Sequence, residues 1–88
     1  MMLVEAELLT QPGNNAVLRL PGRRFPGVVI QGDTLHSLVS TASEALAALE
    51  QGNTSNAQEL LRDAVEQLRD AQARYEAALG EHGLALPY

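Results

Sequence analysis

The sequence predicts an α+β fold: a three-stranded antiparallel β-meander followed by an antiparallel helical hairpin. Three short β-rich runs separated by Pro/Gly turns lie within residues 3–31, and short connections favour antiparallel neighbours. Two long stretches with helical apolar spacing follow within 33–82. Residues 83–88 form a short apolar tail. At 88 residues the chain is expected to form one domain.

The strands are predicted from alternation and from the turns between them. Val4–Leu8 alternates apolar and acidic residues, as a half-buried strand does, although residues 3–9 can also begin a short helix. After a Pro-Gly-Asn-Asn turn, Ala16–Leu20 is the second predicted strand, with Arg19 facing solvent. The third is Val28–Ile30.

The first helix is predicted to begin after Asp33, a good N-cap, and to end at Gly52. Its apolar positions recur every three or four residues. They are Leu35, Leu38, Val39, Ala42, Ala45, Leu46 and Leu49. A helix with this spacing packs one face against a neighbour.

The second helix, 55–82, carries an alanine every seven residues, at Ala57, Ala64, Ala71 and Ala78. Small side chains at one row let two helices approach closely, and larger residues interleaved at the same period, Leu61, Leu68 and Tyr75, are expected to fill the gaps. Ser55–Gln58 resembles a capping box. His82-Gly83-Leu84 is typical of a glycine C-cap.

The unequal helix lengths predict an apolar overhang. At about 1.5 Å per residue the helices span roughly 27 and 42 Å, so the end of the second helix extends past the first. The sheet, the tail folded back, or another chain must cover it. We expect a homodimer whose contact is formed by the apolar residues of this end and of the tail: Tyr75, Ala78, Leu79, Leu84, Leu86 and Tyr88.

Composition argues against several classes of function. The net charge of −5 disfavours nucleic acid as the main partner, because phosphate binding needs a positive surface. Without Cys, and with His36 and His82 separated by the hairpin, no metal site and no cofactor are expected. No long apolar run predicts a membrane span, and Glu5 and Glu7 stand where a signal peptide would be basic. We expect a soluble cytoplasmic protein.

The stretch LPGRRFPGVVIQGD, residues 20–33, is the main candidate for binding. Residues 17–32 hold three Arg and no acid on an otherwise acidic chain. Arg23 and Arg24 are suited to a carboxylate or phosphate, since guanidinium groups bind both through paired hydrogen bonds, or else they pair with the protein's own acids. Phe25 is expected to anchor the loop to the core rather than to stack on a ligand. No nucleotide-binding glycine motif is present.

The outer face of the first helix is a second candidate. His36, Ser37 and Ser40 are small or uncharged, and no acid lies between Asp33 and Glu44. Beside a basic loop such a face suits docking, although a merely solvated exterior explains it equally well. Spacing on one helix does not imply a catalytic geometry, so we expect no enzyme.

Pro12–Ala16 followed by LPGRRFPGVVIQGD, a helical hairpin and a final Leu-Pro-Tyr resembles a family of small bacterial proteins classed as a domain of unknown function. The resemblance covers nearly the whole chain, and PGRRFPG is its most specific part. It implies a bacterial cytoplasmic protein and assigns no site residues.

Two hypotheses of function follow. In the first, the chain is a non-catalytic interaction module, of the immunity or antitoxin-like inhibitor kind, that self-associates and binds another protein through Arg23, Arg24 and the outer helix face. In the second, it is a small sensor that binds an anionic metabolite through the Arg23-Arg24 loop.

Overall fold

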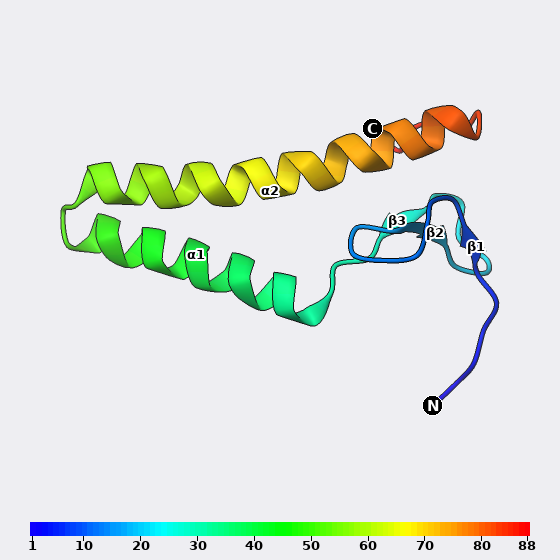
Figure 1. The fold of residues 1–88 in the computed structure, drawn as a ribbon, viewed down its shortest axis with the longest axis horizontal. Helices are drawn as coiled ribbons and strands as arrows, with labels where there is room; N and C mark the ends of the chain where they lie inside the picture. The colour runs from blue at the N-terminus through cyan, green and yellow to red at the C-terminus, as the bar shows by residue number, and fades with distance from the viewer. The chain divides into compact units, whose positions relative to one another are not determined.

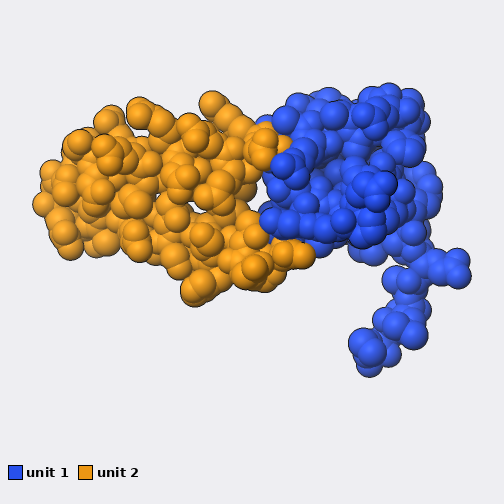
Figure 2. All heavy atoms as spheres, viewed as in Figure 1, with its two compact units in different colours: residues 1–30, 71–88 blue, residues 31–70 orange.

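The computed structural model describes residues 1–88 and confirms the α+β fold, with a three-stranded antiparallel sheet followed by two helices (Figure 1). The elements in chain order are β1 (Glu7–Leu8), β2 (Val17–Arg19), β3 (Gly27–Val28), α1 (Gly32–Glu50) and α2 (Thr54–Glu81). They form two compact units, which Figure 2 colours separately. Unit 1 comprises residues 1–30 and 71–88, and unit 2 comprises 31–70, so α2 contributes to both. Neither helix has an apolar stretch of the length that spanning a bilayer requires.

The sheet has the order β1-β2-β3, with Leu18 of β2 opposite Leu8 on one side and Gly27 on the other. All three strands are shorter than predicted. Of residues 3–9 only Glu7 and Leu8 are in a strand, and neither this segment nor its flanks are helical. β2 ends where the chain turns at Gly22, whose φ of +75° suits glycine and reverses the direction of the backbone.

The core of unit 1 lies between the sheet and the C-terminal part of α2. It consists of Val17, Tyr75, Ala78 and Leu79, and Leu9, Val28 and Leu84 pack against it. The sheet therefore covers the overhanging end of the helix within a single copy. Tyr75, Ala78 and Leu79, which we expected at a dimer contact, are buried within one copy.

The tail is folded back onto α2. Gly83, at φ +66°, ends the helix as predicted, and the Leu84 amide donates to the Leu79 carbonyl at 2.9 Å. Further along, the Tyr88 hydroxyl donates to Glu76 Oε2 at 3.0 Å. Leu84 is half-buried, whereas Leu86 and Tyr88 remain exposed.

Both helices of unit 2 begin slightly before the predicted caps. The N-cap of α1 is Gln31, without a side-chain hydrogen bond, and Asp33 lies in the first turn, where its Oδ1 accepts from the Thr34 amide. The N-cap of α2 is Asn53, whose Oδ1 accepts from the Asn56 amide at 3.2 Å. Asn53 replaces Ser55 in this role because Thr54 and Ser55 already lie within the helix.

The hairpin of unit 2 buries alanines. Ala45 and Ala48 of α1 are buried, and so are Ala57 and Ala64 of α2, as the spacing of seven predicted. The expectation that leucines interleave with them is wrong, because Leu61 and Leu68 are 53% and 51% exposed. The half-buried residues that accompany the alanines are instead Leu38, Thr41, Leu60, Val65 and Gln67.

Candidate functional site

The sheet of unit 1 has apolar residues on both of its faces. Val17 and Val28 face the core. Since neighbouring residues of a strand point to opposite faces, Leu18, Leu20 and Val29 share the other face, where Leu20 is 50% and Val29 37% exposed. An antiparallel sheet that packs one face on a core usually presents polar residues on the other. This outer face is therefore apolar where solvent contact alone would favour polar side chains.

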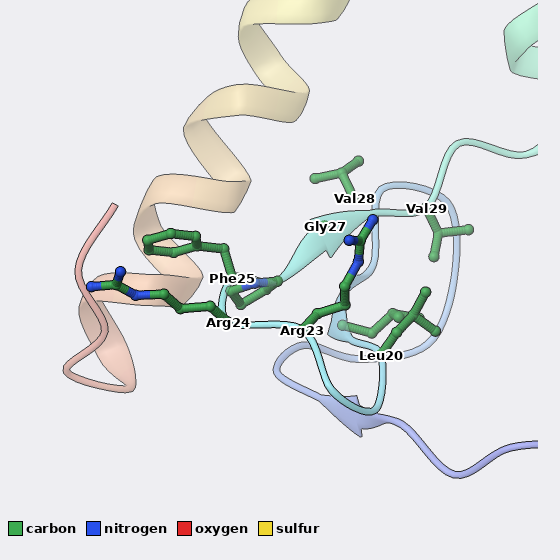
Figure 3. Close-up of a pocket in the computed structure, with 9 residues that line it drawn as sticks. Leu20, Arg23, Arg24, Phe25, Gly27, Val28 and Val29 are labelled. Atoms are coloured by element: carbon green, nitrogen blue, oxygen red, sulfur yellow. The ribbon is translucent and has the colours of Figure 1, made fainter. Parts of the chain in front are cut away.

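A groove of about 720 Å³ lies over this outer face (Figure 3). The residues that line it are Leu18, Leu20, Arg23, Arg24, Phe25, Pro26, Gly27, Val28 and Val29. Gly27 has no side chain to occupy the groove, and a Cβ placed there would meet no atom within 4 Å. The stretch that sequence analysis singled out thus forms most of the wall of one groove.

The two arginines of the groove extend in different directions. In Figure 3 the Arg23 side chain extends toward Val29, whereas Arg24 extends away from it beside Phe25. The Arg24 guanidinium carbon lies 5.1 Å from the centroid of the Phe25 ring, within cation–π range. Neither arginine is ion-paired. In this arrangement they offer two separate positive contacts.

Arg19 holds the arginine loop against the sheet. Its Nε and Nη2 donate to the two carboxylate oxygens of Glu7, at 3.1 and 2.9 Å, across the β1–β2 pair. Its Nη1 also donates to the Arg24 carbonyl at 3.4 Å. The hydrogen bond from Arg19 and its charge lower the pKa of Glu7. Although its place in the strand pattern predicts that Arg19 faces solvent, its side chain is only 24% exposed and its charge is balanced by Glu7.

Tyr75 anchors the end of the same loop. Its buried hydroxyl donates to the Pro26 carbonyl at 2.8 Å, which joins α2 to a residue adjacent to β3. Phe25, the predicted anchor, is half-buried and lines the groove beside Arg24 instead. This contact has no local sequence pattern, because it joins a backbone carbonyl to a side chain 49 residues away.

The predicted helix-face residues belong to the other unit. His36 and Ser37 are exposed on α1 and Ser40 is half-buried. None of the three lines the groove, whose walls come from unit 1 alone. No group of three or more His, Asp or Glu side chains is brought together in a way that could hold a metal ion.

The chain belongs to a family of unknown function (DUF6959), which it matches over residues 1–88. No curated protein and no solved structure matches it. The family agrees with the resemblance noted in the sequence and adds no activity.

Proposed function

We propose that this chain is a non-catalytic protein-interaction module whose groove binds a short segment of another protein. That segment would carry an apolar side chain and at least one carboxylate. The observation that carries the proposal is the outer sheet face: it is apolar, hollowed, and flanked by two arginines without ion-pair partners. An exposed apolar surface with a polar or charged rim is typical of a protein contact.

The apolar floor supplies the affinity in this proposal. Burying one leucine-sized side chain contributes roughly 1.5–3 kcal/mol, and the groove has room for such a group over Gly27. Phe25 and Leu20 would contact it from the walls. Arg23 and Arg24 would favour segments with acidic residues next to this apolar side chain. Charged groups at the rim of an interface contribute more to specificity than to affinity.

The divergence of Arg23 and Arg24 favours an extended ligand over a compact one. A small dianion is held best by guanidinium groups that converge on it. Here the two groups reach different places along the groove (Figure 3). A peptide with acidic residues on both sides of its anchor can contact both arginines at once.

The proposal is tested by selecting binders from a randomised peptide library displayed on phage. We expect the selected peptides to combine a large apolar residue with Asp or Glu. Two variants should abolish their binding: Arg23→Glu with Arg24→Glu, which reverses the rim charge, and Gly27→Val, which fills the groove. The matched control, Arg62→Glu with Arg69→Glu on α2, should bind normally. Peptides without acids, or peptides that bind all three variants, would refute the assignment.

The second candidate function is a small sensor that binds an anionic metabolite through Arg23 and Arg24. The two unpaired guanidinium groups support it. A ligand that binds the folded chain raises its melting temperature. A thermal shift with millimolar phosphate or citrate that disappears in the Arg23→Glu, Arg24→Glu variant would favour this function over peptide binding.

One biological role for such a protein-interaction module is that of an immunity or antitoxin-like inhibitor in the bacterial cytoplasm. In that role Arg23 and Arg24 would contact an acidic site of the target. A toxin gene adjacent to the gene for this chain, and loss of protection when Arg23 and Arg24 are reversed, would support that role.

A further inference from the structure

The hairpin of unit 2 has two parallel rows of apolar residues, and only one of them is buried. The inner row, which includes Leu38 and Ala45 of α1 and Leu60, Ala64 and Gln67 of α2, lies between the helices. The second row follows it one residue later on each helix. Val65 of this row is half-buried, and its other large members are 51–59% exposed: Leu35, Val39, Leu46, Leu49, Leu61 and Leu68.

The second rows of the two helices share one face of the hairpin. One residue advances about 100° around a helix. In an antiparallel pair the two helices turn in opposite senses when viewed along one axis. The same one-residue step from the inner row therefore points to the same side on both, which gives one continuous surface, the apolar face.

The acids of α2 within unit 2 lie away from this face. Glu59, Asp63, Glu66 and Asp70 follow one another at intervals of four, three and four residues, so they form a single row on the far side of α2. The α1 part of the apolar face contains no charged residue between Asp33 and Glu44, and Glu44 lies off its row. Two such faces can meet without opposing like charges.

We propose that the apolar face binds the same face of a second copy, so that two hairpins form an antiparallel four-helix bundle. In such a bundle each helix contacts two neighbours and needs a broad apolar arc rather than one narrow row. The two rows on each helix provide that arc. Layered helices bury their large side chains between layers, which places the exposed leucines at the centre of the assembly.

The size of the face suits a stable homodimer. Nineteen residues of α1 rise about 28 Å, and two adjacent helices are about 18–20 Å wide, which gives on the order of 500 Å² in projection. Its accessible area is larger because the surface is corrugated. Specific interfaces bury about 800 Å² per partner. A symmetric dimer also requires one self-complementary patch, and this face is one.

Sedimentation equilibrium of the full chain provides the first test. We expect twice the chain mass of 9.4 kDa at micromolar concentration. Val39→Glu with Leu46→Glu should give a monomer with unchanged helical circular dichroism, because both side chains are half-exposed in one copy. Ser43→Glu with Ala47→Glu adds the same charge to exposed positions outside the face and should remain dimeric. A monomeric wild-type chain, or a dimer that survives Val39→Glu with Leu46→Glu, would overturn the proposal.

A labelling experiment locates the contact without disruptive charges. Since the chain has no Cys, Ala42→Cys introduces a single thiol on the apolar face and Ala47→Cys one outside it. Maleimide labelling should slow by at least tenfold for Ala42→Cys as the protein concentration rises, and stay constant for Ala47→Cys. Equal behaviour of the two thiols would contradict the proposed face.

The exposed apolar N-terminus, Met1–Val4, is the other group that could occupy the face. Deleting residues 2–4 should leave the dissociation constant of the dimer unchanged. A dimer that needs these residues would assign the contact to the N-terminal segment and overturn the proposal. None of these outcomes depends on the groove of unit 1, so the peptide-binding proposal stands or fails separately.

Discussion

Unit 1 and unit 2 bury different kinds of side chain, although α2 runs through both. In unit 1 the fully buried residues are Val17 and Leu79, and Tyr75 lies beside them. In unit 2 the buried residues are alanines, while Leu46 and Leu61 are more than half exposed. The sheet gives one part of the helix a complete core within a single copy. The other part keeps its larger apolar residues on the surface, where they can serve association.

The largest expected effect is at Leu79. Leu79→Ala should lower the free energy of unfolding by about 2–5 kcal/mol, because it leaves a cavity in the core. That loss should be independent of protein concentration. Leu46→Ala should cost less than about 1 kcal/mol while the chain is monomeric, and more as the concentration rises. Urea unfolding at two concentrations checks both. If Leu79→Ala and Leu46→Ala lower the free energy of unfolding equally and independently of protein concentration, the proposed difference between the two units is wrong.

Tyr75→Phe tests how unit 1 holds its loop. The variant keeps the ring and removes the hydroxyl that donates to the buried Pro26 carbonyl, so we expect a loss of about 1–3 kcal/mol. Tyr88→Phe, which removes an exposed hydroxyl, should change stability by less than about 0.5 kcal/mol. If both variants unfold at the same urea concentration as wild type, Tyr75 does not anchor the loop.

A peptide selected for the groove should also bind the Tyr75→Phe variant more weakly than wild type.

Asn53→Ala tests the turn of unit 2. Loss of an N-cap side chain costs about 1 kcal/mol, and here it removes the acceptor for the Asn56 amide. Ser55→Ala is the matched control, since Ser55 lies inside α2 and should be neutral within about 0.5 kcal/mol. Thermal unfolding followed by circular dichroism distinguishes the two. A larger loss at Ser55 would restore the cap that the sequence suggested.

The smallest effect concerns the pair Glu7–Arg19. Because the pKa of Glu7 is lowered in the folded chain, the pair stabilises the fold above the ordinary Glu value of 4.5, and that contribution is lost as the pH falls through the lower folded value. The Glu7 side chain is 67% exposed to solvent, so the change in stability is small. Carboxyl chemical shifts measured by NMR should give a midpoint below 4.5 for Glu7. Arg19→Gln should raise it, and an unchanged midpoint would contradict the pairing.

Much of this fold follows from local sequence. The glycines at 52 and 83 end the helices because both adopt positive φ, and the alanines seven residues apart are buried as expected. These features depend on the backbone conformation and on helical spacing, which sequence reports directly. The arginine loop was also found from sequence, because two adjacent arginines between Pro-Gly pairs stand out on an acidic chain.

The remainder depended on contacts that spacing does not determine. Both the alanines and the leucines of α2 repeat every seven residues. The period alone therefore does not determine which row is buried, and the structure shows that Ala64 is buried and Leu61 is exposed. Leu18 and Leu20 are typical strand residues by sequence, and only the structure shows that both line the groove. The bond from Tyr75 to Pro26 joins distant parts of the chain and has no local signature.

Amide hydrogen exchange measured over a range of protein concentrations tests the central difference between the units. We expect the protection of α1 and of the part of α2 in unit 2 to rise with concentration, because the apolar faces of two copies meet. Protection of β2 and of residues 75–79 should stay constant, because their core is complete in one copy. Exchange that is independent of concentration throughout, or protection that rises only in unit 1, would contradict it.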